Sequence, residues 1–304
     1  MLIANPIYDA VFKYLMADIK AAKILISTIT GYDIVEISPR TQEIPINSPI
    51  LLLSVVRMDF VAVIRTSDGE DKKIIIELQK SENDSDIMRF QKYLSEAYST
   101  VEEINGEEVI LPITSIYILG FNLSFSCSLT KVIRKYYDGI TNEEILVKDK
   151  FIESLTHDSF VVQIRKLPKK SQNILENFLM IFNQYYILKE KNNKKYLHLP
   201  TDEVFSEEEK YIINLLSKAT KDKEVQDQID SYEEFEKNLQ KKLRKKEIEI
   251  EDLKKKEEEA KQREEEAKQR EEEAKLDLRT IILKFQSKGF TLEEIALDLG
   301  KTVA

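Results

Sequence analysis

The chain has 304 residues, of which 42% are hydrophobic, and this suffices for one sizeable globular domain with an appendage or for two small domains. Its formal net charge of -9 argues against a general nucleic-acid coat protein, but it leaves room for an enzyme that grips phosphates locally. A single cysteine, Cys127, excludes a disulfide framework and a thiolate zinc cluster. Two histidines leave oxygen ligands, and hence magnesium, manganese or calcium, as the available metal chemistry.

The sequence starts Met-Leu-Ile-Ala-Asn-Pro without a basic leader, and no apolar run approaches the roughly 20 residues of a membrane span. We therefore expect a cytoplasmic protein with no membrane partner.

The N-terminal region predicts two helices. Asn5 and Pro6 form a typical helix start, with Asn as the N-cap and Pro at the first helical position. A second helix is expected from Asp18 to about Thr30, ending at Gly31. Residues 40 to 66 are expected to be extended.

The next segment predicts a β-hairpin. Residues 58–64 are rich in β-branched and aromatic side chains, Asp68-Gly69 is a strong turn signal, and residues 74–79 form a second strand. If the loop is the three residues 67–69, with Gly69 in the left-handed conformation, the residue numbers of any two paired positions on the strands add to 136. That register places Asp59 opposite Glu77.

Two carboxylates directly opposite each other repel, and a divalent cation between them resolves the conflict. Glu77 shares a strand face with Gln79, because side chains alternate along a strand. The simpler alternative is that both acids are solvated at the ends of their strands, since polar residues there are ordinary.

The chain then predicts a helix over 85–104, a buried central strand over 113–120 and a further strand over 159–167. Beyond Ser171 the pattern is helical. From about Glu224 to Phe285 there is no proline or glycine, and the seven-residue unit Glu-Glu-Glu-Ala-Lys-Gln-Arg is repeated. Acid-before-base pairs four residues apart support this helix. The repeated alanines form a thin apolar seam, so we expect a solvated spacer.

The order helix, acidic hairpin, helix and buried strand is the αβββαβ layout of the PD-(D/E)XK nuclease superfamily. The chain resembles most closely the recombination-promoting nuclease and transposase family, in which the final lysine of the motif is a glutamine. The matching pieces are Asp9 to Lys13, Asp59, Glu77-Leu78-Gln79, Arg89 with Tyr93, Arg165 to Lys169, and the charged helical tail followed by residues 288–296.

The resemblance implies a restriction-endonuclease-like α/β (α+β) core and metal-assisted hydrolysis of DNA phosphodiester bonds, linked to recombination or mobile elements. It implies that Asp59, Glu77 and the Leu78 carbonyl hold Mg²⁺ or Mn²⁺. Gln79 would orient the attacking water but brings no positive charge, so activity is expected to be weak. The implied substrate-binding residues are Lys13, Arg89 and Tyr93.

The expected organisation is a nuclease-like core over 1–170, a helical extension packed on it over 171–222, a long charged helix over 223–288 and a short helical element over 289–304 that resembles a truncated helix-turn-helix. Two functions remain open. One is a magnesium-dependent DNA endonuclease. The other is a weak or inactive nuclease fold that binds DNA or protein, with self-association or a protein partner through the charged helix.

Overall fold

A computed structural model describes residues 1–40, 43–48, 51–57, 59–80, 84–188, 193–201, 204–289, 291 and 294–295. The side chains of 43–48, 51–57, 84–89 and 150 lie outside this description. Among the described residues, no helix is both long enough and apolar enough to cross a bilayer.

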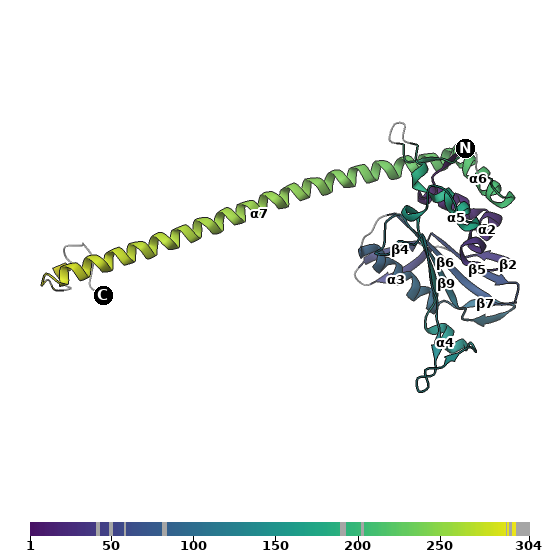
Figure 1. The fold of residues 1–304 in the computed structure, drawn as a ribbon, viewed down its shortest axis with the longest axis horizontal. Helices are drawn as coiled ribbons and strands as arrows, with labels where there is room; N and C mark the ends of the chain where they lie inside the picture. Colours follow the sequence, from purple (N-terminus) through teal and green to yellow (C-terminus); the bar gives the residue numbers. More distant parts are fainter. Residues whose placement is uncertain are drawn as a thin grey trace. The chain divides into compact units, whose positions relative to one another are not determined.

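The fold is mixed α/β and is organised around a six-stranded sheet with the order β10-β13-β9-β6-β5-β2 (Figure 1). Its strands are β2 (Ile34–Pro39), β5 (Phe60–Thr66), β6 (Asp71–Gln79), β9 (Ile113–Leu119), β10 (Leu129–Val132) and β13 (Asp158–Gln163). The three central strands β6, β9 and β13 run parallel, and the strands outside them are antiparallel to their neighbours. The predicted buried strand is confirmed, since β9 lies in the middle of the sheet.

Strands β5 and β6 form the predicted hairpin in the predicted register. Phe60 pairs with Ile76 and Arg65 with Asp71, so paired positions add to 136 throughout. Gly69 has a φ of 85°, as the short loop requires.

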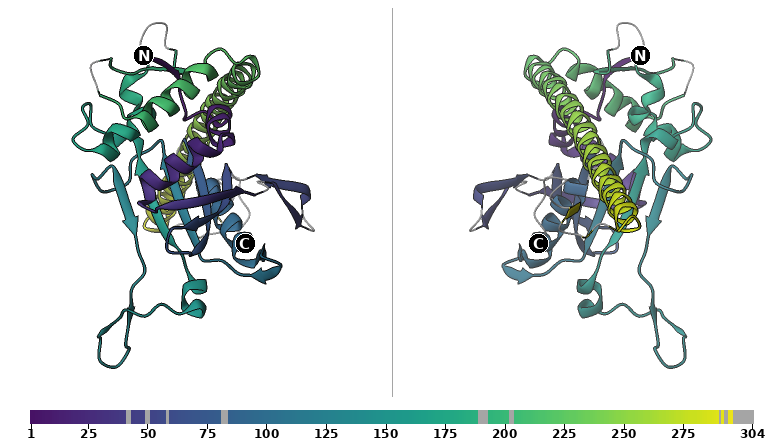
Figure 2. Two further views of the ribbon diagram at one scale, coloured as in Figure 1. Left: turned by 90° about the vertical axis from the view of Figure 1, so that its right-hand side faces the viewer. Right: turned by 90° about the vertical axis from the view of Figure 1, so that its left-hand side faces the viewer.

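Helices cover both faces of the sheet (Figure 2). The larger core packs Ile74, Ile76 and Ile116 of the sheet against the N-terminal and C-terminal helices of the compact unit. A smaller core packs Val61 and Ile75 against α3. The helices are α1 (Asp9–Ala17), α2 (Ile19–Thr30), α3 (Asp84–Ser99), α4 (Lys150–Leu155), α5 (Ile174–Leu179), α6 (Glu207–Ala219) and α7 (Lys223–Gln286).

Short elements complete the described part of the chain. They are the strands β1 (Leu2–Ala4), β3 (Glu43–Ser48), β4 (Leu51–Arg57), β7 (Glu102–Ile104), β8 (Glu107–Val109), β11 (Tyr136–Tyr137), β12 (Glu144–Ile145) and β14 (Tyr196–His198), and the 3-10 turns η1 (Ile164–Lys166), η2 (Met180–Phe182) and η3 (Gln184–Tyr186).

The first predicted helix begins later than expected. Its N-cap is Tyr8, and the helix starts at Asp9. Asn5 is buried, and its side-chain amide donates to the Gln184 Oε1 at 2.9 Å and to the Lys194 carbonyl at 2.8 Å. Its side chain therefore ties the N-terminus to distant segments. The second helix matches its prediction, with Asp18 as N-cap and Gly31 left-handed at the C-cap.

The helix predicted over 85–104 ends at Ser99 instead, because a hairpin follows it. Asn105 and Gly106 both have positive φ and form the turn between β7 and β8. Glu102 lies outside the helix, and its carboxylate forms ion pairs of 2.8 Å with the buried Lys73 and with Arg40. The strand predicted over 159–167 likewise ends at Gln163 and continues as η1.

Beyond the sheet, the long helix matches its prediction, since α7 runs unbroken for 64 residues. The chain divides into two compact units, Met1–Ser231 and Tyr232–Ala304. The start of α7 belongs to the first unit, where Val225 and Ile229 join the main core. The expectation of a solvated spacer is therefore wrong for the first two turns of the long helix.

The element after α7 is described only in part. Thr291 and Glu294 form the reciprocal hydrogen bonds of a capping box. Most of the predicted helix-turn-helix-like segment lies outside the described residues.

Candidate active site

The two predicted acids lie where the β5–β6 hairpin opens. Asp59 directly precedes β5, and continuing the Phe60–Ile76 register by one residue sets Asp59 opposite Glu77. The Asp59 Oδ2 accepts a hydrogen bond of 2.6 Å from the Leu78 backbone N–H. Glu77 is only 2% exposed, so it is not a solvated strand end. This burial argues against the simpler alternative for Glu77.

The surroundings of the pair disfavour ionisation of Asp59. Burial, and next to it the negative charge of Glu77, raise the pKa of the Asp59 carboxyl well above its ordinary value. The Leu78 N–H and Lys13 act in the opposite direction without reversing the shift. Holding both carboxylates ionised therefore costs free energy, and a bound cation would remove that cost.

Gln79 lies two residues beyond Glu77 on β6 and therefore on the same face of the strand. Its side chain is buried, and its Nε2 has no hydrogen-bond partner among the described residues. A buried amide donor without an acceptor is unusual in a folded protein. Because Gln79 shares a strand face with Glu77, this donor is available to a ligand or a water on that face.

Helix α1 brings two further charged groups toward the pair. The Lys13 Nζ forms an ion pair of 2.8 Å with the Asp9 Oδ2. Both charges act on the Asp59 carboxyl, and Asp9 raises its pKa while Lys13 lowers it. The charges of predicted Lys13 and of Asp9 therefore both reach Asp59.

The other predicted residues are less directly placed. Tyr93 is 2% exposed, and its ring packs edge-on against Phe90 in the smaller core. The Arg89 side chain lies outside the described part of the chain. Contact of either residue with a phosphate stays a prediction.

Two neighbours of the site come from β9 and were missed in the sequence. Tyr117 pairs directly with Glu77 across the parallel ladder, and burial, followed by the charge of Glu77, raises its pKa. Gly120 donates its N–H to the Gln79 carbonyl at 2.7 Å. Only the pairing of β6 with β9, about forty residues apart in sequence, brings them to the acids, and no local signal marks that pairing.

The donor set fits a hard divalent cation with a partly open coordination shell. Among the described residues, no group of three or more His, Cys, Asp or Glu side chains is placed to hold a metal ion. Asp59 and Glu77 with the Leu78 carbonyl would supply only part of a shell. Mg²⁺ commonly binds in this way, with one or two carboxylates and the remainder from water and phosphate oxygens.

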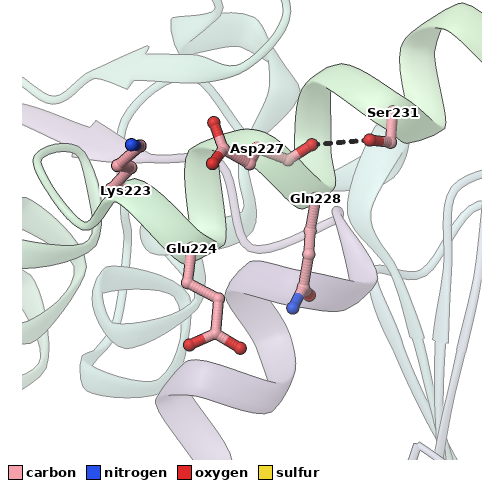
Figure 3. A pocket seen from close by; sticks show the side chains of 5 residues that line it. All are labelled: Lys223, Glu224, Asp227, Gln228 and Ser231. Atoms are coloured by element: carbon pink, nitrogen blue, oxygen red, sulfur yellow. Dashed lines mark hydrogen bonds between the residues drawn. The ribbon is translucent and has the colours of Figure 1, made fainter.

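One surface hollow elsewhere does not offer comparable chemistry. Figure 3 shows this hollow along the first turns of α7, lined by Lys223, Glu224, Asp227, Gln228 and Ser231. The Ser231 hydroxyl donates to the Asp227 backbone carbonyl at 2.8 Å, which is a bond within the helix. These side chains come from one helix face and do not converge on a point.

Comparison of the chain with protein-family models, with curated proteins and with solved structures finds no match in any of the three. The case for a function therefore comes from the geometry of the site and from the order of the elements around it.

Proposed function

We propose that this protein is a magnesium-dependent DNA endonuclease of the PD-(D/E)XK type. The observation that carries the proposal is the pair of half-buried Asp59 and buried Glu77, opposed across a hairpin, in which desolvation and then the charge of Glu77 raise the pKa of Asp59. A carboxylate pair of this kind is costly to a fold unless it serves a bound cation.

The element order supports the proposal. Along the chain, α2 is followed by the antiparallel sheet strands β2, β5 and β6. Helix α3 comes next, and then strand β9, which runs parallel to β6. This is the αβββαβ order expected from the resemblance, with the β3–β4 hairpin inserted between β2 and β5 and the β7–β8 hairpin inserted between α3 and β9. The link to recombination or mobile elements rests on the resemblance alone.

Each residue then has a definite role. Asp59 and Glu77, with the Leu78 carbonyl, would hold the metal, and the Leu78 N–H keeps the Asp59 carboxylate oriented. When bound, Mg²⁺ or Mn²⁺ supplies charge neutralisation at the phosphate and lowers the pKa of a bound water. Gln79 orients that water through its Nε2, and Lys13 supplies positive charge near the phosphate.

The decisive experiment measures cleavage of supercoiled, linear and single-stranded DNA with Mg²⁺, with Mn²⁺ and in EDTA. We expect slow, metal-dependent cleavage that Asp59→Asn and Glu77→Gln each reduce by at least about 100-fold. Asn is preferred to Ala at 59 because its side-chain oxygen still accepts the Leu78 N–H. A control, Asp33→Asn, changes an exposed acid elsewhere and should cleave like the wild type. Undiminished cleavage by the Asp59 or Glu77 variant would rule out the site.

One observation favours the binding alternative. Gln79 carries no charge, so the site lacks a cation at that position. If the chain binds Mn²⁺ and DNA through Asp59 and Glu77 but cleaves none of the three substrates, the fold serves as a binding module.

A further inference from the structure

The long helix carries an apolar seam in one unbroken heptad frame. Taking alternate steps of four and three residues from Leu239 to Phe285 visits the following positions: Leu239, Leu243, Lys246, Ile250, Leu253, Glu257, Ala260, Glu264, Ala267, Glu271, Ala274, Leu278, Ile281 and Phe285. All of them lie in α7. Only Lys246 and three glutamates interrupt the apolar character.

The frame extends well beyond the repeated Glu-Glu-Glu-Ala-Lys-Gln-Arg unit. The block from Leu239 to Leu253 and the block from Leu278 to Phe285 do not contain that unit, yet both fall in the same frame on either side of it. Repetition of a charged unit cannot explain this agreement. A spacer helix in water has no reason to preserve a seven-residue period, whereas a supercoiled pair of helices requires one.

Five of the larger apolar side chains of the seam are solvent-exposed within the Tyr232–Ala304 unit, whereas Leu278 and Phe285 are half-buried. Leu239, Leu243, Ile250 and Leu253 are 45%, 52%, 52% and 65% exposed, and Ile281 is 40% exposed. The seam from 239 to 285 is about 70 Å long at 1.5 Å per residue. A partner that covers it must be a helix of similar length.

A second copy of this chain supplies such a helix, with the same length and the same heptad frame. The seam glutamates Glu257, Glu264 and Glu271 are flanked by Lys256, Arg263 and Arg270 on one side and by Lys261, Lys268 and Lys275 on the other. The structure shows these glutamates paired within the helix to the lysines four residues on. When two such helices pack seam to seam, the seam glutamates approach the basic flanks of the other copy, but those flanks are all basic and also face one another, so the apolar blocks rather than the charges supply the attraction.

We propose that the protein forms a homodimer in which the α7 seams of two copies pack as a two-stranded coiled coil. The apolar blocks at 239–253 and 278–285 supply most of the apolar contact between the two helices. The alanines at 260, 267 and 274 let the backbones approach between them. This inference does not depend on the nuclease proposal.

The test compares two pairs of substitutions of the same residue types in the full chain. Ile250→Glu with Leu253→Glu places charge in the seam. Ile248→Glu with Leu276→Glu places charge at exposed positions on the opposite side of the helix, where these residues are 57% and 66% exposed. Glutamate is a good helix former, so both pairs preserve the helix, which circular dichroism checks.

Sedimentation equilibrium over a concentration series should show a wild-type dimer. The seam pair should raise the dimer dissociation constant by at least about 100-fold, and the control pair should leave it within about threefold. Glu257→Leu with Glu264→Leu should instead tighten the dimer. This second variant keeps the test informative, because misfolding would not strengthen specific dimerisation. A wild-type monomer at every concentration, or a dimer that survives the seam pair, would overturn the inference.

Discussion

At the residue scale, the acid pair couples the protein's stability to pH. The native state holds the Asp59 proton more tightly than the unfolded chain, because the pKa of Asp59 is raised above its ordinary value of 3.8. This group therefore favours the folded state at low pH. That contribution is lost as the pH rises from the unfolded pKa through the folded one.

We therefore expect Asp59→Asn to gain stability over the wild type in EDTA as the pH rises from about 4 to about 7, because asparagine never ionises. The gain should approach about 1 to 3 kcal/mol and should shrink when Mg²⁺ is added, since only the wild type gains a ligand. Urea unfolding at several pH values measures it. If the difference in unfolding free energy between variant and wild type does not change with pH, the pKa of Asp59 is not raised in the folded state. The control Asp33→Asn should show no pH-dependent gain.

Gln79 offers a second test at the same scale. Gln79→Lys introduces an ammonium group on the face of β6 that carries Glu77, beside the attacking water of the proposed reaction. We expect cleavage to be kept or raised by up to about 100-fold, measured as kcat at saturating metal. Lost cleavage with normal metal affinity would show that the neutral Nε2 donor has a specific role.

At the element scale, the site depends on how closely β9 and the end of β6 approach. A Cβ atom built on Gly120 would lie 2.5 Å from the Lys80 carbonyl oxygen and 3.0 Å from its Cα. Both are backbone atoms, so relief would require the strand end itself to move. That strand end carries Glu77 and Gln79.

Gly120→Ala should therefore destabilise the protein by about 1 to 3 kcal/mol and weaken metal binding at the site. Denaturant unfolding and Mn²⁺ titration measure the two effects. Gly139→Ala is the matched control, because no atom lies within 4 Å of a Cβ added there. Equal effects of the two substitutions would mean that the close contact between residue 120 and the Lys80 backbone does not affect stability or metal binding.

At the scale of the whole molecule, the first turns of α7 belong to the folded unit that carries the site. Ala219 at the end of α6, and Val225 and Ile229 in α7, are buried in the main core. Lys195 also forms an ion pair with Asp230. A chain cut after Ser217 loses these contacts, whereas a chain cut after Ser231 keeps them.

We expect residues 1–231 to melt like the full chain and to retain the metal-dependent cleavage proposed above. Residues 1–217 should be less stable by about 3 to 6 kcal/mol, the free energy of burying two aliphatic side chains. Thermal melts of the two fragments beside the full chain measure this. Equal melting of both fragments would show that the start of α7 contributes nothing to the core.

The sequence by itself determined the elements whose signals are local. The hairpin register followed from Asp68-Gly69 and strand alternation, the end of α2 from Gly31, and α7 from the lack of helix breakers and its acid–base pairs. The Asn105-Gly106 turn also carries a local hairpin signal, whereas the helix predicted over 85–104 covers residues that form the strand before it. Local chemistry therefore specified the opposition of Asp59 and Glu77 before any tertiary contact was known.

Only the tertiary structure decided the contacts between segments far apart in the chain. Asn5 has the chemistry of an N-cap, yet hydrogen bonds to Gln184 and Lys194 engage its amide, and the helix starts later. Burial of Glu77, its pairing with Tyr117 and the proximity of Asp9 and Lys13 depend on β9 and α1 packing around the hairpin. The pKa of Asp59 is likewise a tertiary property, because desolvation depends on what surrounds a carboxyl rather than on its neighbours in sequence.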